Sequence, residues 1–482
     1  MNKAETSKLS VSLHKNLVYI QELFHLSSDL KVRSFKIKDN IVRDGAILYF
    51  DAITDTKNIQ EHLLTPLLKV GKIDNIEDVI SCHLSLMDVS SVTSYDEIST
   101  GLSEGKTIVI IEGFDQAILA NSTDWQMRAV TEPDTQRSAK GSMIGFNEQL
   151  NVNINLLRNM IQMPNLKVET RKVGSKSKTD VAIIYIDEFV DQSILEETRR
   201  IISEIDVTYL LEARVIEDAI EKKPKLFPLV FTCERADVSV SALFEGRVVI
   251  LINGVPYALI VPTLFLHYFH QPDEYNTKSG RFSKRLLRFV CWFVSIFSLG
   301  FYITLVRFHP HWIRHPFDDK LLTQSDTLFP ILLEIMFLLF LFELLTEASL
   351  RIPKATIILL SLIGAIVVGQ TSVETKLIHP LTLVVVGINY LTSINIASGG
   401  LFGAMRTLRI FFLLLGYFFG VTGMIIGFII VTVYMASLKS LGVPYLAPFF
   451  PFRFKEMKDS LYRGNLQNLI NSKHTYPHKV KE

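Results

Sequence analysis

The pattern of apolar and charged positions changes near Arg285. Up to that residue, charged side chains interrupt every apolar run, and runs such as 46–52, 107–113 and 181–187 have the length of single β-strands. Amphipathic helical patterns lie between these runs. We therefore predict an α/β or α+β region over residues 1–285, of α/β class with two subdomains that join near residues 120–165.

One hairpin can be placed within this region. Residues 247–262 read RVVILINGVPYALIVP, with Asn253 and Gly254 between two β-rich runs. A two-residue type I′ turn needs positive φ at both central residues, and Asn-Gly meets that need. We predict a hairpin with its turn at these two residues.

Beyond Arg285 the chain becomes predominantly apolar. Spanning a bilayer takes roughly 20 apolar residues in a helix. Five hydrophobic segments approach this length, at residues 286–306, 329–348, 355–373, 377–398 and 410–437. They predict an α-helical polytopic membrane domain over residues 286–437, followed by a basic polar tail at 438–482. Gly364, Gly369 and Pro380 interrupt the third and fourth segments, so one of these two can also be re-entrant.

Charge predicts the orientation of this membrane domain. Lys278, Arg281, Lys284, Arg285 and Arg288 precede or open the first segment, which favours a cytoplasmic N-terminal region. Five full spans would then place the basic tail outside. Four spans with one re-entrant segment would keep the tail inside.

Composition excludes several functions. The formal net charge is +1, so the sequence gives no sign of the clustered basic residues that are typical of a nucleic-acid-binding protein. The three cysteines lack the spacing of a zinc site or a disulfide framework, and we expect no metal and no cofactor. The N-terminal region contains no nucleotide-binding, hydrolase or metalloprotease motif, which argues against an enzyme. The first residues lack the apolar core of a cleaved signal peptide.

Polar residues within the apolar segments are the candidates for function. An ionisable group there is costly unless it is paired or faces water. We select Glu334, Glu343, Gln370 and Asn389 as pore or gating candidates, each with a structural role as the alternative. Glu347 and Arg351 are four residues apart, and we predict a structural ion pair. Gly416, Gly420, Gly423 and Gly427 predict close helix packing on the last segment.

Several ordered blocks resemble a known family. They are TEPDTQRSAKGSMIGFNEQLNVNINLLR (131–158), FPLVFTCERADVSVSALFEGRVVILINGVPYALIVP (227–262), FELLTEASLRIP (342–353), IGAIVVGQTSV (363–373) and LKSLGVPYLAP (438–448). Together they resemble the A subunits of spore germinant receptors, the GerA family. The positions that match the family's motifs are Glu132, Pro133, Gly141, Phe146, Asn153, Arg158, Glu234, Arg235, Asp237, Gly246, Arg247, Gly254 and Pro256. The chain departs from the family at Lys140, Ser142 and Ala236.

The resemblance implies a partner set and a role. It implies a receptor in the spore inner membrane with a permease-like B subunit, a lipoprotein C subunit and several copies of this chain, which together release cations when nutrient binds. The cluster of Glu234, Arg235 and Asp237 fits a subunit contact or an internal salt bridge equally well. Two other functions stay open from the residues alone, a secondary transporter with broken helices near 364–380 and a membrane-anchored enzyme.

Overall fold

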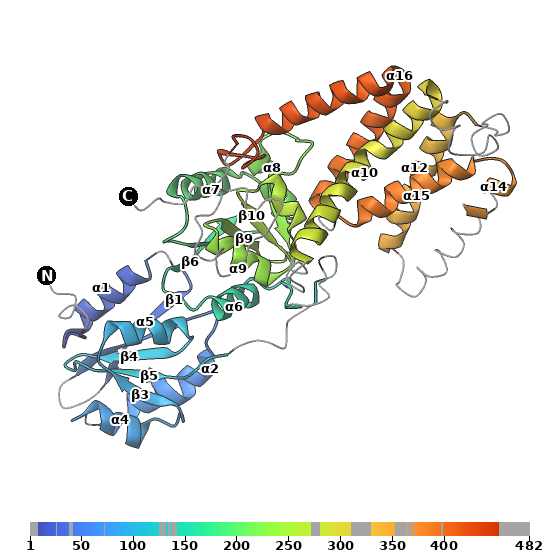
Figure 1. Ribbon diagram of the computed structural model, residues 1–482. Coiled ribbons are helices and arrows are strands. Elements are labelled where there is room, and N and C mark those ends of the chain that lie inside the picture. The colour runs from blue at the N-terminus through green and yellow to red at the C-terminus, as the bar shows by residue number, and fades with distance from the viewer. Residues whose placement is uncertain are drawn as a thin grey trace.

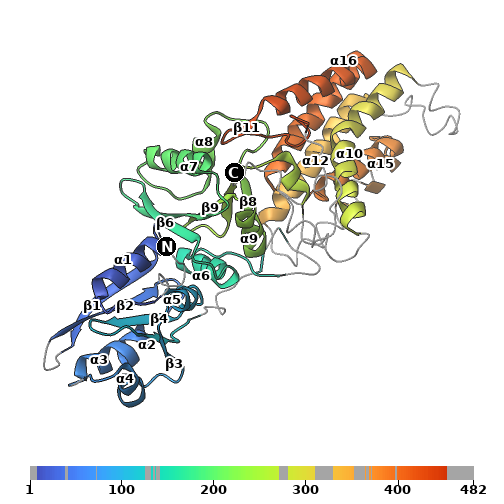
Figure 2. The same ribbon diagram turned by 60° about the vertical axis from the view of Figure 1, so that its left-hand side comes forward.

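The chain folds into two successive sheet-and-helix subdomains followed by a bundle of long helices (Figures 1 and 2). This computed structural model describes residues 8–25, 27–37, 42–71, 73–124, 132–133, 136, 142–270, 280–309, 329–351, 364, 369–370, 372–396 and 399–452. The predicted mixture of sheets and helices in the N-terminal region is confirmed.

The first subdomain is built on a five-stranded antiparallel sheet in the order β1-β2-β4-β5-β3. The apolar run predicted as a strand at 107–113 supplies β4, which is buried at every position. Ser94 and Glu97 form a capping box that starts α5. The elements are α1 (Leu13–Leu23), β1 (Leu30–Ile37), β2 (Arg43–Phe50), α2 (Thr56–Ile59), η1 (Gln60–Leu64), α3 (Thr65–Lys69), α4 (Ile76–His83), β3 (Val89–Val92), α5 (Tyr95–Ser103), β4 (Thr107–Ile111) and β5 (Ala117–Ala120).

The second subdomain repeats this architecture. Its sheet has the order β6-β7-β9-β10-β8, and all of its strand pairs are antiparallel. The predicted β9–β10 hairpin is present, and the chain turns at Asn253 and Gly254 as predicted, because Val255 N donates to Ile252 O at 3.2 Å. The loop runs from residue 253 to 257 and only Gly254 of the two central residues has positive φ, so the predicted type I′ two-residue loop is wrong. The elements are α6 (Leu150–Met160), β6 (Leu166–Val173), β7 (Thr179–Ile186), α7 (Gln192–Glu204), α8 (Arg214–Glu221), β8 (Phe231–Cys233), α9 (Ala236–Phe244), β9 (Val248–Ile252), β10 (Ala258–Val261) and η3 (Phe265–Phe269).

The two subdomains are copies of one unit, which our sequence reasoning missed. GLSEGKTIVIIEGFDQAILA at 101–120 aligns without a gap with ALFEGRVVILINGVPYALIV at 242–261. LKV at 30–32 likewise matches LKV at 166–168, in the first strand of each sheet. The same order of helices and strands occurs in both. The internal repeat was therefore visible in the sequence, at the level of whole motifs rather than of single residues.

Equivalent hydrogen bonds show how closely the copies agree. Asn16 Nδ2 donates to Ser10 O at 2.6 Å, and Ser10 N donates back to Asn16 Oδ1 at 2.9 Å. In the second copy Asn153 Nδ2 donates to Asn147 O at 2.7 Å, and Asn147 N donates back to Asn153 Oδ1 at 2.9 Å. Both asparagine side chains are buried. This reciprocal pair satisfies backbone groups at the start of α1 and α6, as buried polar groups require.

In the part of the chain that the structure describes, the helical bundle contains α10 (Gly280–Phe308), α12 (Ile331–Arg351), α15 (Pro380–Ile394) and α16 (Gly399–Ser437), with the short α14 (Ser372–Glu374) before α15. We call the end next to the second subdomain the near end and the opposite end the far end. At the near end, the ring of Phe289 on α10 stacks on Phe269 at 4.2 Å. α10 then runs to the far end, where Phe308 lies against Gly420.

α16 reverses direction at Gly420, so the prediction of a single segment at 410–437 is wrong. Gly420 has φ 63° and ψ −146°, a conformation outside the helical range that glycine adopts without strain. Phe412 before the reversal and Phe428 after it both contact Phe297 of α10. The first arm, residues 399–419, thus runs away from the second subdomain, and the second arm, 421–437, returns to it (Figure 1).

α12 and α15 both run from the far end back to the near end. The N-terminal residue Glu334 of α12 lies beside His379, which precedes α15. Near the other ends of the two helices, Phe342 stacks on Tyr390. Asn395 lies beside Cys291 in the early part of α10. Hence the chain leaves α12 at the near end and enters α15 at the far end. Most of the third predicted segment, 355–373, lies outside the described residues.

The segment after α16 packs into the second subdomain. β11 (Lys439–Ser440) and β12 (Val443–Pro444) form a small antiparallel pair. Ser440 Oγ donates to Leu229 O at 2.7 Å and accepts from Thr263 N at 2.9 Å. Tyr445 is buried, and its carbonyl accepts from Phe265 N at 2.9 Å. We call residues 438–447 the clasp, because it fixes the end of the bundle to the same subdomain that holds the start of α10.

Two helices in the described part of the chain meet the length and hydropathy of a bilayer span. They are Lys284–Phe308, with mean hydropathy 2.1, and Gly400–Ser437, with mean hydropathy 2.3. The second of these contains the reversal at Gly420.

Candidate functional site

The motif residues of the second subdomain are mainly buried and paired inside the chain. Arg235 is buried, and its guanidinium donates to both carboxylate oxygens of Asp237, at 3.0 and 2.7 Å. It also donates to Gln136 O at 3.3 Å, and Glu234 N donates to Gln136 Oε1 at 3.2 Å. Of the two roles predicted for this cluster, the structure contains the internal salt bridge between Arg235 and Asp237.

The remaining motif residues of this subdomain support turns and strand ends. Arg247 is buried, and its Nε donates to Pro262 O at 3.0 Å. Gly246 and Gly254 adopt positive φ, 79° and 90°, at the ends of β9, while Pro256 lies in the β9–β10 loop. Phe146 N donates to Glu234 O at 2.8 Å. Glu132 is exposed, Pro133 is buried, and Gly141 lies outside the described residues.

Arg158 joins the two subdomains. Its Nε and Nη2 donate to the Asp29 carboxylate at 2.5 and 2.8 Å, and the guanidinium lies 3.9 Å from the centre of the Phe50 ring. Both charged side chains are almost fully buried, Arg158 at 2% and Asp29 at 7% exposure. On the same helix, Asn155 Nδ2 donates to the Ala52 and Asp124 carbonyls at 2.9 Å. The sequence showed Arg158 as a motif residue but gave no signal for its partner.

Lys167 is a second buried cation at this junction. Its Nζ donates to Leu23 O at 2.7 Å, and its side chain is 5% exposed. Burial lowers the pKa of Lys167 to about 8, an effect that the nearby Asp187 opposes and Arg158 strengthens. The junction therefore holds two buried cationic side chains.

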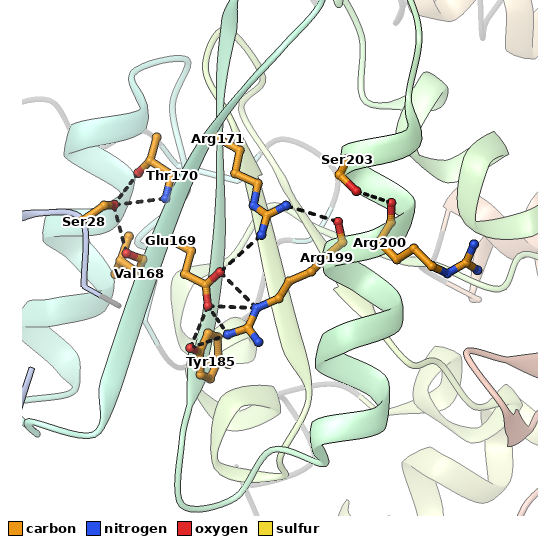
Figure 3. Close-up of polar contacts among 9 residues, drawn as sticks. All are labelled: Ser28, Val168, Glu169, Thr170, Arg171, Tyr185, Arg199, Arg200 and Ser203. Carbon is orange, nitrogen blue, oxygen red and sulfur yellow. Dashed lines mark hydrogen bonds and ion pairs between the residues drawn. The ribbon is translucent and has the colours of Figure 1, made fainter. Parts of the chain in front are cut away.

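Strand β6 carries polar contacts to both of its neighbours (Figure 3). On one side, Ser28 of the first subdomain donates its N–H to Val168 O at 2.8 Å and accepts from Thr170 N at 3.0 Å through its Oγ. On the other side, Glu169 binds the Arg199 guanidinium of α7 and accepts from the Tyr185 hydroxyl at 2.7 Å. Burial, followed by the hydrogen bond to Glu169, raises the pKa of Tyr185.

The bundle distributes the four predicted pore candidates over different places. Asn389 is fully buried and links α15 to α10, because its Nδ2 donates to Ser295 O and Ser298 Oγ, both at 2.8 Å. Glu343 is partly exposed near the near end and pairs with Arg406 of α16. Gln370 is exposed and donates to Glu374 Oε1 at 2.9 Å.

Glu334 lies apart from these three; it is fully buried in the first turn of α12 and accepts a hydrogen bond of 3.4 Å from His379 N, just before α15. The side chain of Arg351 lies outside the described residues, so the predicted Glu347–Arg351 pair stays a prediction. In the part of the chain that the structure describes, no three His, Cys, Asp or Glu side chains gather as metal ligands. The polar side chains of the bundle thus include carboxylates, amides and hydroxyls together with the cationic Arg406 and the buried Arg409.

The glycines of α16 allow close packing. A Cβ added to Gly416 would lie 2.4 Å from Gly300 O of α10, and one added to Gly427 would lie 2.4 Å from Leu415 on the other arm of α16. Small residues at such positions let helix backbones approach one another. Gly420 instead makes the reversal. Packing at Gly416 and Gly427 is therefore the role that the contacts support.

Comparison with known proteins identifies the family. The family model described as "Bacillus/Clostridium GerA spore germination protein" matches residues 18–475. Spore germination protein KA of Bacillus subtilis (strain 168) is 32% identical, over 94% of this chain and 85% of that protein. Stage V sporulation protein AF of the same organism is 30% identical, over 91% of this chain and 89% of that protein.

A solved structure is also similar. It is the crystal structure of the N-terminal domain of the A subunit of the Bacillus megaterium spore germinant receptor GerK3, at 29% identity and a TM-score of 0.43, covering 54% of this chain and 98% of that chain. The family match extends from α1 through the bundle and beyond the clasp. The chain is thus a member of the GerA family of spore germination proteins.

Proposed function

We propose that this chain is the A subunit of a nutrient germinant receptor in the spore inner membrane and that it forms or gates a path for cations. The observation that carries the proposal is the family match over residues 18–475, which includes both the subdomains and the bundle. Relatives named for spore germination are similar over more than nine-tenths of the chain. The partners are a permease-like B subunit, a lipoprotein C subunit and further copies of this chain.

The path of the chain supports a multi-pass topology with both ends of the bundle on one side. α10 runs away from the second subdomain and α12 returns; because α15 starts at the far end, the proposal includes one further crossing between α12 and α15. α15 returns, and the two arms of α16 add one crossing out and one back. This makes six crossings, an even number, so the basic tail lies on the same side as the N-terminal region. That arrangement removes the conflict that five spans created.

Thiol labelling tests this topology. Met87 in the first subdomain and Phe452 after the clasp are exposed, and Lys376 is exposed at the far end. With Cys82 replaced by Ser, we expect a membrane-impermeant maleimide to label M87C and F452C from one side and K376C only from the other. Labelling of M87C and F452C from opposite sides would refute the six-crossing path.

The second subdomain is the element through which a signal would reach the bundle. It holds the start of α10 through Phe289 and Phe269, the start of α16 through the contact of Gly400 with Pro228, and the end of α16 through the clasp. A ligand shifts a conformational equilibrium only by its differential affinity for the two states. Movement of the second subdomain would act on all three helix ends together, which suits a two-state gate.

Deletion of the gene tests the function. Spores that lack this chain and intact spores are exposed to a panel of amino acids, sugars and nucleosides while cation release is followed. We expect the deletion to abolish the response to one class of nutrient. If spores that lack both this chain and the other receptors still responded fully to every nutrient, the receptor role would be contradicted. Within the bundle, Glu334, Glu343, Gln370 and Asn389 stay the proposed pore or gating residues, and Glu343→Gln is expected to change the rate of cation release.

A further inference from the structure

The segment between α8 and β8 contacts the bundle at several points. We call residues 226–230 the connector. The Leu226 N–H donates to the hydroxyl of Tyr434, in the last turns of α16, at 3.2 Å. The carbonyl of Pro228 accepts from the hydroxyl of Tyr268, which lies in η3 ahead of α10, also at 3.2 Å. Backbone groups of the connector therefore hold two separate parts of the chain that lead into or out of the bundle.

Packing and the clasp add to these contacts. Pro228 also lies against the start of α16, where a Cβ added to Gly400 would be 3.3 Å from Pro228 Cγ. Phe227 is fully buried among aromatic rings of η3, α16 and the clasp. The carbonyl of Leu229 accepts from Ser440 Oγ of the clasp at 2.7 Å. The connector thus contacts η3, the start and the end of α16, and the clasp.

A side chain of α8 holds the connector from the opposite direction. Glu221, the last residue of α8, accepts from Leu229 N at 3.2 Å through its Oε1. Its Oε2 lies 3.4 Å from Nη2 of Arg214, the first residue of the same helix. Glu221 is 6% exposed. Burial raises the pKa of its carboxyl, whereas the Leu229 N–H and Arg214 oppose that rise. Both oxygens of this buried carboxylate are therefore engaged, as its burial requires.

We propose that Glu221 is a positioning residue, which fixes the connector and, through the connector, the two ends of α16 and the segment that leads into α10. The backbone of Leu229 is the joint, because its N–H binds Glu221 and its carbonyl binds Ser440. A shift of the C-terminal end of α8 therefore moves the clasp with it. The inference deepens the proposed function by naming the element through which the second subdomain acts on the bundle, and only that meaning rests on the proposed function.

Hydrogen exchange measured by mass spectrometry tests the inference on the full-length chain in detergent micelles. Glu221→Leu removes the acceptor of the Leu229 N–H. We expect exchange to become about five- to tenfold faster, the loss of one hydrogen bond, in the connector, in the clasp and in residues 262–266. Residues 262–266 are included because Thr263 N donates to Ser440 Oγ at 2.9 Å. Exchange in β7, a buried strand of the same subdomain, should not change.

Two matched variants separate positioning from charge and from general stability. Glu221→Gln keeps an oxygen that can accept from Leu229 N, so it should restore wild-type exchange in all three segments. Asp218→Asn removes a carboxylate that pairs with the same Arg214 but is 60% exposed, so exchange should again match the wild type.

Three outcomes would overturn the inference. The first is wild-type exchange throughout Glu221→Leu, and the second is faster exchange in the connector alone. The third concerns Ser440→Ala, which opens the same joint from the clasp side and is informative even if Glu221→Leu destabilises the whole subdomain. Ser440→Ala should speed exchange in the connector and the clasp together, and an effect confined to the clasp would overturn the joint at Leu229. These measurements need no germinant and no partner subunit, so they can fail while nutrient-triggered cation release in spores still supports the proposed function.

Discussion

Replacing Arg158 with Met should destabilise the interface between the two subdomains. Arg158 is 2% exposed and binds Asp29 through two hydrogen bonds of 2.5 and 2.8 Å. Met retains apolar contact with Phe50 but leaves Asp29, at 7% exposure, as a buried carboxylate without its ion-pair partner. Removing one member of a buried pair costs about 3–5 kcal/mol. We therefore expect Arg158→Met to lower the free energy of unfolding by about that amount.

The double variant Arg158→Met with Asp29→Leu distinguishes a lost ion pair from lost packing. It removes both charges together, so no unpaired buried charge remains, and we expect it to recover most of the stability. The assay is urea unfolding of the full-length chain in detergent, followed by circular dichroism. Limited proteolysis between the subdomains reports whether the junction itself has opened.

Arg200 provides the matched control. It lies on the exposed face of α7 and pairs with Glu197 and Glu204 in solvent. Exposed ion pairs contribute little to stability, so Arg200→Met should leave the unfolding midpoint unchanged. An Arg158→Met variant as stable as the wild type would refute the reasoning. A double variant as unstable as the single one would show that shape, rather than charge, holds the junction.

Three further predictions follow from single contacts. The pKa of Lys167 is about 8 in the folded chain and 10.5 ordinarily, so the folded chain binds fewer protons than the unfolded chain between these values. The free energy of unfolding of the wild type should therefore rise relative to that of Lys167→Met from pH 8 to 10.5. Urea titrations should give about 2 kcal/mol, which is the roughly 3 kcal/mol of this pKa difference reduced by solvent screening. Burial raises the pKa of Cys233 to about 12, so iodoacetamide at pH 8 should label the exposed Cys82 and spare Cys233 until the chain unfolds, as mass spectrometry would show. Gly416→Val should destabilise the bundle by about 1–3 kcal/mol through overpacking, whereas Gly403→Ala, where nothing lies within 4 Å, should not change the unfolding temperature. Labelling of Cys233 in the folded chain would contradict its burial. A stability difference between wild type and Lys167→Met that does not change with pH would contradict the lowered pKa of Lys167. Equal effects of the two glycine variants would contradict close packing at Gly416.

The predictions from sequence succeeded where the signal was local. The runs at 46–52, 107–113 and 181–187 contribute to β2, β4 and β7, because an apolar run of that length fits a buried strand. The long apolar run after Arg285 belongs to α10, because an apolar run of that length fits a long helix. The β9–β10 hairpin was found through Asn253 and Gly254, although the loop proved longer than two residues. Hydropathy could not find the reversal at Gly420, because apolar residues continue on both sides of it.

The candidate sites were harder to predict than the elements. Glu334, Glu343, Gln370 and Asn389 were selected together because each is polar in an apolar segment, yet the structure gives each a different environment. Asn389 joins two helices through its Nδ2, Glu343 pairs with Arg406, and Glu334 accepts a long hydrogen bond from His379 N. Burial in a helix bundle depends on which helices are neighbours, and a single apolar segment does not carry that information.

By itself, the sequence determined the classes of element and the change from a mixed to an apolar chain near Arg285. It also contains the tandem copies, which carry the pairs EG (104–105) and EG (112–113) in the first copy and EG (245–246) and NG (253–254) in the second. These properties depend on neighbours within a few residues and so can be read along the chain. Only the tertiary structure decided that Arg158 pairs with Asp29, that Ser440 binds Leu229, and that Glu334 lies beside His379. Such pairings join residues far apart in sequence, and their stability comes from burial that exists only once the chain has folded.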